Sequence, residues 1–210
     1  WETLHYELMN CKSFTWAVAF ITSDMLTPLK VVLADLDRQG IQGTLITSDY
    51  LGFNSPQMFA ELLKIPNLKV MVTTVTGFHT KGYFFTHDDY STALIGSANL
   101  TRAALLQNHE TMLKVTSSQN STLFSQITTG IRHLQSESYP LIKEWITNYA
   151  KSWQLSKANN SLKQNSQKII PNQMQRTALN ELQGLINRGA HRGLVISATG
   201  TGKTYLGAFA

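Results

Sequence analysis

The stretch LKVMVTTVTGFHTKGY, residues 68–83, decides how we interpret this chain. Its first half is apolar and β-branched, which is typical of a buried strand. One of the six histidines of the chain, His79, then stands two residues before Lys81. On an extended strand, residues i and i+2 project from the same face, so we expect these two side chains to lie side by side. An imidazole beside an ammonium suits a phosphate better than it suits a core.

Candidate strands and helices alternate before this stretch. Short β-branched or aromatic runs predict strands at 15–21 and 44–47. A helix is expected from Pro28 to Gly40, and a second at 55–64 with Ser55 as its cap. Alternation of this kind predicts an α/β fold with a mixed, mostly parallel sheet flanked by helices.

The pattern changes after residue 80. The runs KGYFFT (81–86) and STALIG (91–96) flank HDDY and predict a hairpin. Further helices are expected at 98–107, 121–136 and 140–155, with a strand at 110–116.

Composition limits the class of protein. The 210 residues are 42% hydrophobic and 15% charged, as in a globular protein with a real core. No apolar run approaches the roughly 20 residues that span a bilayer, and the N-terminus has no signal-peptide pattern. For this reason we expect no membrane partner. The single cysteine, Cys11, cannot form an internal disulfide, so we expect a reducing, cytoplasmic location.

The net charge of +5 is unevenly divided. Residues 1–155 carry 11 basic and 12 acidic side chains, whereas residues 156–210 carry seven basic and one acidic. Any anion affinity of the first part must therefore come from local placement of cations rather than from bulk charge.

A second group of candidate site residues follows the histidine. Gly96 and Ser97 end a predicted strand, Asn99 is expected to open a helix, and Glu110 to start the next strand. Gly96 permits close backbone approach, and amides at a helix N-terminus bind phosphate oxygens. Glu110 could accept a proton from His79 and fix its orientation. Taken singly, Asn99 could be only a helix cap, Ser97 a turn residue and Glu110 a surface residue.

The sequence HTK followed by GSANLT and NHE resembles the phospholipase D superfamily, over about residues 4–120. The nuclease-like branch that is fused to helicases is the most similar. The resemblance implies a metal-independent phosphodiesterase without a cofactor, with His79 as the nucleophile that forms a phosphohistidine. Lys81 and Asn99 would bind nonbridging oxygens, Ser97 would assist, and Glu110 would orient His79. The family's motif has an aspartate that would fall near Thr86 here, and Asp88 and Asp89 lie a little later, in a longer turn.

The chemistry of this family needs two such motifs, and this chain carries one. A twofold homodimer would bring two copies of His79 together, because an isologous interface repeats each residue across its axis. We therefore expect a homodimer that acts on DNA.

The end of the sequence carries a different motif. Residues 156–168 are polar and are predicted to be a linker, which separates a phospholipase D-like domain (1–155) from residues 169–210. The strand LVIS runs into ATGTGKT, which resembles the first ATP-binding motif of superfamily 2 helicases, and PNQMQRTAL resembles their glutamine motif. We expect the first elements of a RecA-like helicase domain, with ATP and Mg²⁺ as ligands of the full-length helicase. The expected nucleotide-binding residues are Gln175, Thr199, Gly200, Thr201, Gly202, Lys203 and Thr204, with Gln173 as the alternative to Gln175.

Three functions remain open from the sequence. The preferred one is the nuclease domain of a DNA helicase or restriction-type enzyme. The second is a non-catalytic module that binds nucleic acid or dimerises. The third, hydrolysis of lipid or other phosphodiesters, ranks below these because no membrane-seeking segment is present.

Overall fold

The computed structural model describes residues 1–164, 171–195 and 206–207, and for 155–164 it describes the backbone alone. The chain forms two compact units, Trp1–Ala158 and Asn159–Ala210.

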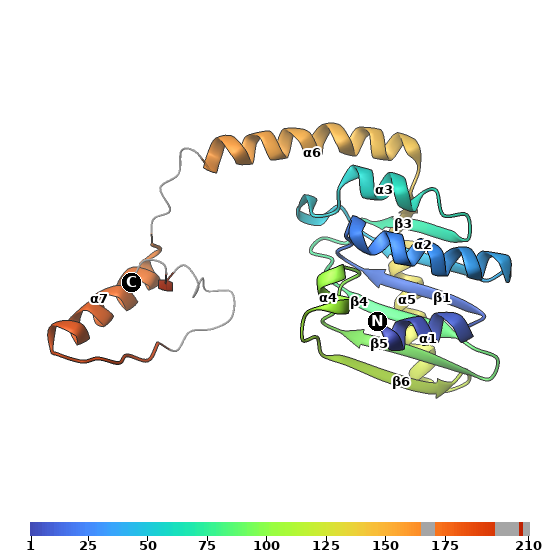
Figure 1. Cartoon of the computed structure of the whole chain (residues 1–210), viewed down its shortest axis with the longest axis horizontal. Coiled ribbons are helices and arrows are strands. Elements are labelled where there is room, and N and C mark those ends of the chain that lie inside the picture. The colour runs from blue at the N-terminus through green and yellow to red at the C-terminus, as the bar shows by residue number, and fades with distance from the viewer. Residues whose placement is uncertain (165–170, 196–205, 208–210) are drawn as a thin grey trace. The chain divides into compact units, whose positions relative to one another are not determined.

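A seven-stranded sheet forms the centre of the first unit (Figure 1). Its strands follow the spatial order β6-β5-β4-β1-β2-β3-β7. Their bounds are β1 Ser13–Val18, β2 Gln42–Thr47, β3 Leu68–Thr73, β4 Lys81–Thr86, β5 Tyr90–Gly96, β6 Met112–Ser118 and β7 Ser138–Pro140.

The predicted α/β class with a mixed sheet is confirmed, but the expectation of mostly parallel pairing is wrong. Two pairings, β1–β2 and β2–β3, are parallel, and four are antiparallel. The parallel pairs are joined by helical crossovers, whereas β4 and β5 are joined by a tight turn, closed by a 2.9 Å bond from His87 N to Tyr90 O. A tight turn reverses the chain and gives antiparallel pairing.

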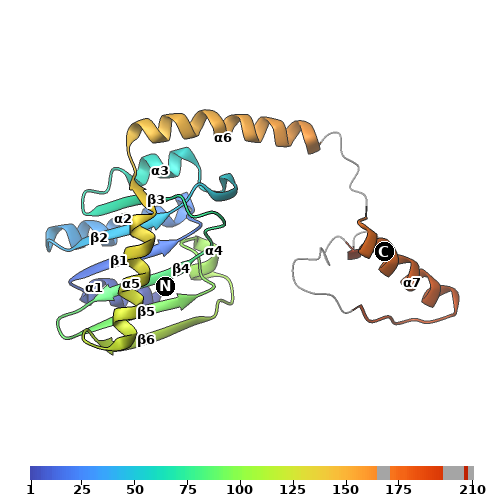
Figure 2. The ribbon, with the colours of Figure 1, turned by 180° about the vertical axis from the view of Figure 1, so that it is seen from behind.

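Helices cover both faces of this sheet. They are α1 Glu2–Asn10, α2 Ser23–Arg38, α3 Pro56–Leu62, α4 Arg102–Leu106, α5 Thr122–Ser136 and α6 Lys143–Gln164, with a 3₁₀ turn η1 at Tyr50–Gly52. Helices α1 and α2 lie on one face, and α5 crosses the other (Figures 1 and 2).

Several predicted boundaries shift. Ser55 caps α3 as predicted, because its Oγ accepts a 3.1 Å bond from Met58 N. Helix α2 begins at Ser23 rather than at Pro28, since Met25 and Leu26 pack into the core and extend the helix upstream. Helix α1 and strand β7 were not predicted.

The predicted linker, 156–168, is in part helical. Helix α6 continues through Gln164, and the sequence contains no glycine or proline between 156 and 164 that would end it. The junction of the two compact units falls within this helix. The domain boundaries proposed from the sequence remain predictions.

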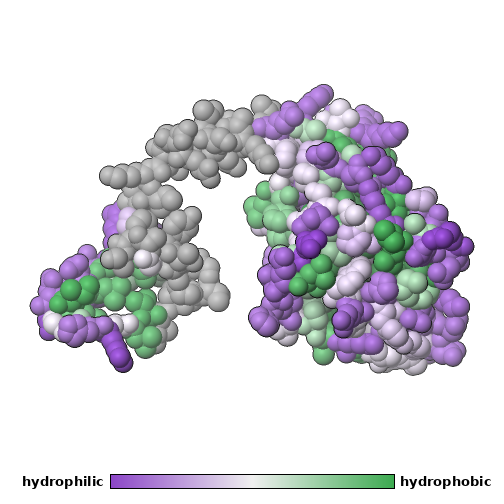
Figure 3. Space-filling model, in the orientation of Figure 1, coloured by the Kyte–Doolittle hydropathy of each residue, from purple (hydrophilic) through white to green (hydrophobic). Residues whose placement is uncertain are grey.

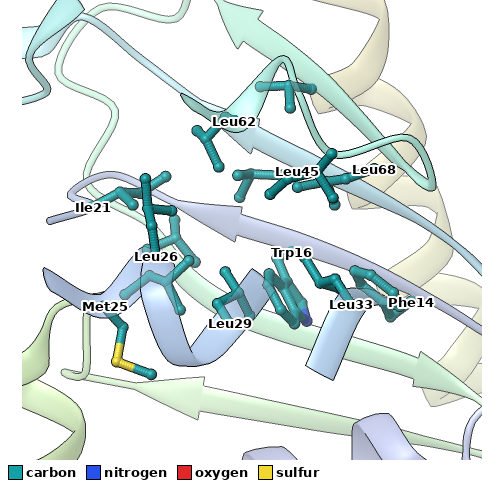
Figure 4. Close-up of a cluster of buried hydrophobic side chains, with 14 of the residues drawn as sticks. Phe14, Trp16, Ile21, Met25, Leu26, Leu29, Leu33, Leu45, Leu62 and Leu68 are labelled. Carbon is teal, nitrogen blue, oxygen red and sulfur yellow. The ribbon is translucent and has the colours of Figure 1, made fainter. Parts of the chain in front are cut away.

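The main core fills the space between the sheet and α2 (Figure 4). Trp16 of β1 is fully buried there among leucines of α2, and Phe14 packs beside it with ring centroids 4.8 Å apart. The alternate residues Ala17 and Ala19 face a smaller cluster with Phe78 on the other side. Side chains of β1 therefore alternate between two apolar layers, as a central strand requires.

A buried carboxylate fastens α1 to the sheet. Glu7 is 1% exposed, and its two oxygens contact Lys114 Nζ at 2.6 Å and His87 Nε2 at 2.9 Å. The other ring nitrogen of His87 lies 3.0 Å from the carbonyl of Asn10. The carboxylate thus ties helix α1 to the β4–β5 turn and to β6.

We expect Glu7→Ala to lower the free energy of unfolding by about 3 kcal/mol, because it leaves Lys114 and His87 facing an uncompensated site. Urea denaturation of the whole chain measures this. Glu2→Ala, which removes an exposed carboxylate from the same helix, should change stability by less than about 0.5 kcal/mol. Equal effects of the two substitutions would contradict this role of Glu7.

The second unit contains helix α7, Gln173–Asn187. Asn172 caps it by accepting from Gln175 N, and the Gln175 side chain accepts from Asn172 N, which completes a capping box. No helix among the described residues is long and apolar enough to cross a membrane.

Candidate active site

His79 and Lys81 lie side by side, as the sequence predicts. Lys81 is the first residue of β4, and His79 stands just before this strand. Lys81 Nζ lies 2.9 Å from His79 Nδ1 and 3.0 Å from Nε2, and it donates a 2.8 Å bond to the His79 carbonyl. An ammonium can only donate, so the imidazole presents a lone pair to it.

Burial of Lys81 leaves its charge poorly solvated. The residue is 8% exposed, and within the described residues no carboxylate forms an ion pair with it. Removal from water lowers the pKa of Lys81, and the charge of Glu110 opposes this change. A buried ammonium without an ion-pair partner is a strong attractor for an anion.

Phe20 connects the two halves of the site. Its ring meets the His79 ring edge-on at 5.3 Å between centroids. Its backbone N–H donates to Asn99 Oδ1 at 3.3 Å, and its carbonyl accepts from Leu100 N at 3.1 Å. Phe20 therefore holds the segment after β5 beside the start of β4. The sequence predicts a strand at 15–21 that includes Phe20, and no local pattern marks this residue as part of the site.

Asn99 does not open a helix, contrary to prediction. Helix α4 begins at Arg102, and Thr101 caps it by accepting a 3.2 Å bond from Ala104 N. Asn99 and Leu100 instead lie beside the residues that follow β1, with a bridge between Ile21 and Leu100. The side-chain oxygen of Asn99 is used by Phe20, which leaves the Nδ2 group as the donor for a ligand.

Ser97 and Glu110 form a second polar pair. Ser97 Oγ donates to Glu110 Oε2 and accepts a 3.0 Å bond from Thr111 N. A Cβ on Gly96 would lie 2.1 Å from the carbonyl of Thr111, so only glycine allows this close approach of the two segments. The structure shows Gly96 admitting the Thr111 backbone, and its approach to a phosphate stays a prediction.

The predicted hydrogen bond between Glu110 and His79 is not among the described interactions. The Glu110 carboxylate accepts from Ser97 and from Asn108 Nδ2, the latter at 3.3 Å. The charge of Glu110 nevertheless opposes the lowering of the Lys81 pKa that burial causes, so this carboxylate acts on the site at longer range. The structure therefore places Glu110 beside Ser97, and its role in orienting His79 stays a prediction.

Within the described residues, neither the Cys11 thiol nor a cluster of metal-binding side chains offers an alternative active site. Burial raises the pKa of the Cys11 thiol to about 11, and the thiol donates to the Leu8 carbonyl at 3.3 Å. A thiol of this pKa is a poor nucleophile near neutral pH. In the part of the chain that the structure describes, no group of three or more His, Cys, Asp or Glu side chains could hold a metal ion.

Of the seven predicted nucleotide-binding residues, the structure describes Gln175. Gln175 is buried, and its Oε1 accepts a 2.9 Å bond from Asn172 N. The remaining predicted residues lie outside the described residues: Thr199, Gly200, Thr201, Gly202, Lys203 and Thr204.

The family of the first unit follows from its sequence. The family described as "Cardiolipin synthase, PLD-like domain" matches residues 5–133, so the chain belongs to this phospholipase D-like family. The family described as "Type III restriction enzyme, res subunit" matches residues 168–210. No curated protein sequence matches the chain.

Solved structures share the fold at low sequence identity. NucT from Helicobacter pylori is 18% identical with a TM-score of 0.54, and the match covers 67% of this chain and 89% of that one. Phosphatidylserine synthase from Haemophilus influenzae Rd KW20 is 14% identical with a TM-score of 0.51, covering 77% of this chain and 43% of that one. At these identities the likeness shows a common fold.

We expect sulfate to bind at Lys81 and its affinity to fall at least about twofold between neutral pH and a pH of about 10.5, because the ammonium loses its proton. An ammonium is charged below its pKa, and burial places the pKa of Lys81 below the ordinary 10.5, so more than half of the Lys81 side chains are neutral at that pH. Sulfate itself does not titrate there. Calorimetric titration measures the affinity.

Lys81→Arg is the matched variant, because a guanidinium stays charged up to about pH 12. Its sulfate affinity should remain nearly constant over the same range. An equal fall in both proteins would assign the pH dependence to another group.

Proposed function

We propose that residues 1–155 form a metal-independent phosphodiesterase that cleaves DNA through a phosphohistidine at His79, within a helicase or restriction-type enzyme. Membership of the phospholipase D-like family over residues 5–133 supports this reaction class. The observation that carries the proposal is the buried Lys81 ammonium held 2.9 Å from the His79 ring without an ion pair within the described residues.

The chemistry needs positioned charge and a neutral nucleophile. An incoming phosphate would accept the hydrogen bonds that Lys81 now gives to His79, which frees the imidazole lone pair. The ring nitrogen then attacks phosphorus, a P–N bond forms, and the P–O bond to the leaving strand breaks. Lys81 and the Asn99 Nδ2 group stabilise the nonbridging oxygens as charge develops on them. Ser97, whose hydroxyl is bonded to the Glu110 carboxylate, assists by holding that side chain in place.

The leaving oxygen needs a proton, and a second histidine is the group suited to give it. We place this histidine on a second copy of the chain, as His79 across a twofold axis. The same group then removes a proton from water, which attacks phosphorus, breaks the P–N bond and restores free His79.

The helicase context rests on the second unit. The match to the restriction-enzyme family at residues 168–210 supports a motor that follows the nuclease domain. In the full-length helicase, the loop from Thr199 to Thr204 would hold the phosphates of ATP with Mg²⁺, and Gln175 would contact the adenine. Gln175 already anchors the start of α7, which would place a nucleotide contact on a rigid helix end.

A second candidate function is favoured by the position of Glu110. The Glu110 carboxylate bonds Ser97 and Asn108 rather than His79. A site formed by Lys81 and Asn99 could therefore bind a DNA phosphate without cleaving it. The same assay separates the two functions, because such a module binds DNA and leaves it intact.

His79→Ala should lower the nicking of supercoiled plasmid in excess chelator at least about a thousandfold, because the nucleophile is lost. Gel electrophoresis measures the conversion to open circles. His133→Ala, which removes an exposed histidine of α5, should nick like the parent chain. Binding of plasmid by all three proteins without any nicking would instead support the non-catalytic module.

A ninefold excess of His79→Ala should lower the activity per wild-type chain to about one tenth. Random exchange of subunits places most wild-type chains in dimers that contain a single His79. Plasmid nicking after equilibration of the mixture measures this. The same excess of His133→Ala should cause no inhibition. Sedimentation as a strict monomer at assay concentration would contradict the two-histidine mechanism.

A further inference from the structure

An exposed aromatic ring lies next to the candidate active site. Phe53 is 51% exposed, and its ring centroid lies 4.4 Å from that of Phe20 with an interplanar angle of 34°. Phe20 in turn touches the His79 ring, and Lys81 Nζ lies 5.7 Å from the Phe20 centroid. Figure 3 shows hydrophobic surface at the left edge of the first unit, the edge at which the chain near residue 50 lies in Figure 1.

A buried asparagine fixes Phe53 in this position. Asn54 is 1% exposed, and its Oδ1 accepts a 2.9 Å bond from Ile21 N. Its Nδ2 donates 2.8 Å bonds to the carbonyls of Ala19 and Ser48. One side chain thus bonds the residues on both sides of Phe20, and it is adjacent in sequence to Phe53.

Helix α6 holds the same loop from the other side. Trp153 Nε1 donates to the Gly52 carbonyl at 2.7 Å, and the Tyr149 hydroxyl donates to the Asn54 carbonyl at 2.7 Å. The backbone turns sharply here, with positive φ at Leu51 and Gly52. Because the carbonyls of Gly52 and Asn54 are both bonded, the backbone on each side of Phe53 is held in place, and its half-exposed ring projects from a fixed point.

Packing does not account for this arrangement. Phe20 belongs with the smaller apolar cluster, whereas half of Phe53 remains in water at the end of a rigid turn. The exposed ring of Phe53 packs on Phe20, and Phe20 borders the Lys81 cation; aromatic rings near a cation are what proteins use to stack nucleic-acid bases.

We propose that Phe53, backed by Phe20, is a shelf on which one base of single-stranded nucleic acid stacks while Lys81 holds the adjoining phosphate. This inference rests on the proposed function and names its substrate class. The Phe20 centroid lies 4.4 Å from that of Phe53 and 5.7 Å from Lys81 Nζ. Because one sugar separates a base from its phosphate, we assign the contacts with Phe53 and Lys81 to one nucleotide. In a duplex both faces of a base are covered by neighbouring bases, so the shelf selects single-stranded or unpaired segments.

The test compares two oligomers with the same number of phosphates, oligothymidylate and a fully abasic strand. Their charge is equal, so phosphate contacts contribute equally to both affinities. We expect the parent chain to bind oligothymidylate about tenfold more tightly than the abasic strand in fluorescence anisotropy titrations. Phe53→Leu should bring this ratio close to one, and Phe53→Tyr should keep it.

Tyr90→Leu is the matched control, because Tyr90 is 38% exposed and stands at the opposite end of β5 from Gly96. Its ratio should equal that of the parent. Circular dichroism checks that each variant is folded.

The remaining outcomes are distinct. A parent ratio of one, or no binding of either oligomer, would overturn the shelf. A ratio that survives Phe53→Leu would do the same, and a variant that changes the sedimentation of the chain rather than the ratio would assign Phe53 to an interface between copies. Absence of plasmid nicking with the expected ratios intact would overturn the proposed cleavage and leave the shelf in place.

Discussion

The backbone of Phe20 is the constraint on which the candidate active site depends. It continues β1 beyond the last paired residue of that strand and exchanges hydrogen bonds with the segment after β5, while its ring rests against His79. Lys81, Asn99 and Phe53 come from segments far apart in sequence, and each touches this one residue. A displacement of the end of β1 would therefore disperse the cation, the amide and the aromatic surface together. The contacts that support this site are two ring contacts, a bond to the Asn99 side chain and one backbone bond to Leu100 N, all made by a residue that lies just beyond the packed strand β1.

Electrostatics gives this site its direction. Lys81 is withdrawn from water, and its nearest partners are a carbonyl and an imidazole rather than a carboxylate. Elsewhere in the first unit a buried charge is neutralised: Glu7 meets both Lys114 and His87. The contrast shows that burial of charge here does not by itself imply function. The buried charge that lacks a counter-ion within the described residues is the one that lies beside an exposed histidine, and an anionic substrate would supply what is missing.

Local patterns predicted much of the fold, and their failures have physical causes. Apolar periodicity located six of the strands, and Ser55 correctly marked the start of α3. The mostly parallel sheet was wrong because pairing direction depends on connections that the pattern of apolar residues does not encode. The helix predicted at 98–107 begins only at Arg102, because Asn99 and Leu100 bond the residues that follow β1. Helix α6 runs into the predicted linker because polar composition, without glycine or proline, does not end a helix.

The sequence alone determined the class of protein and the chemistry available to it. His79 and Lys81 are two residues apart, so strand geometry brings them together in any fold that extends this segment, and the family resemblance rests on the same residues. Tertiary structure decided what surrounds them. Phe20, Phe53 and Asn54 carry no local signal, and the bonding of Glu110 to Ser97 rather than to His79 arises from the close approach of two segments at Gly96. Contacts of this kind depend on how separate strands pack, and packing is settled only when the whole chain has folded.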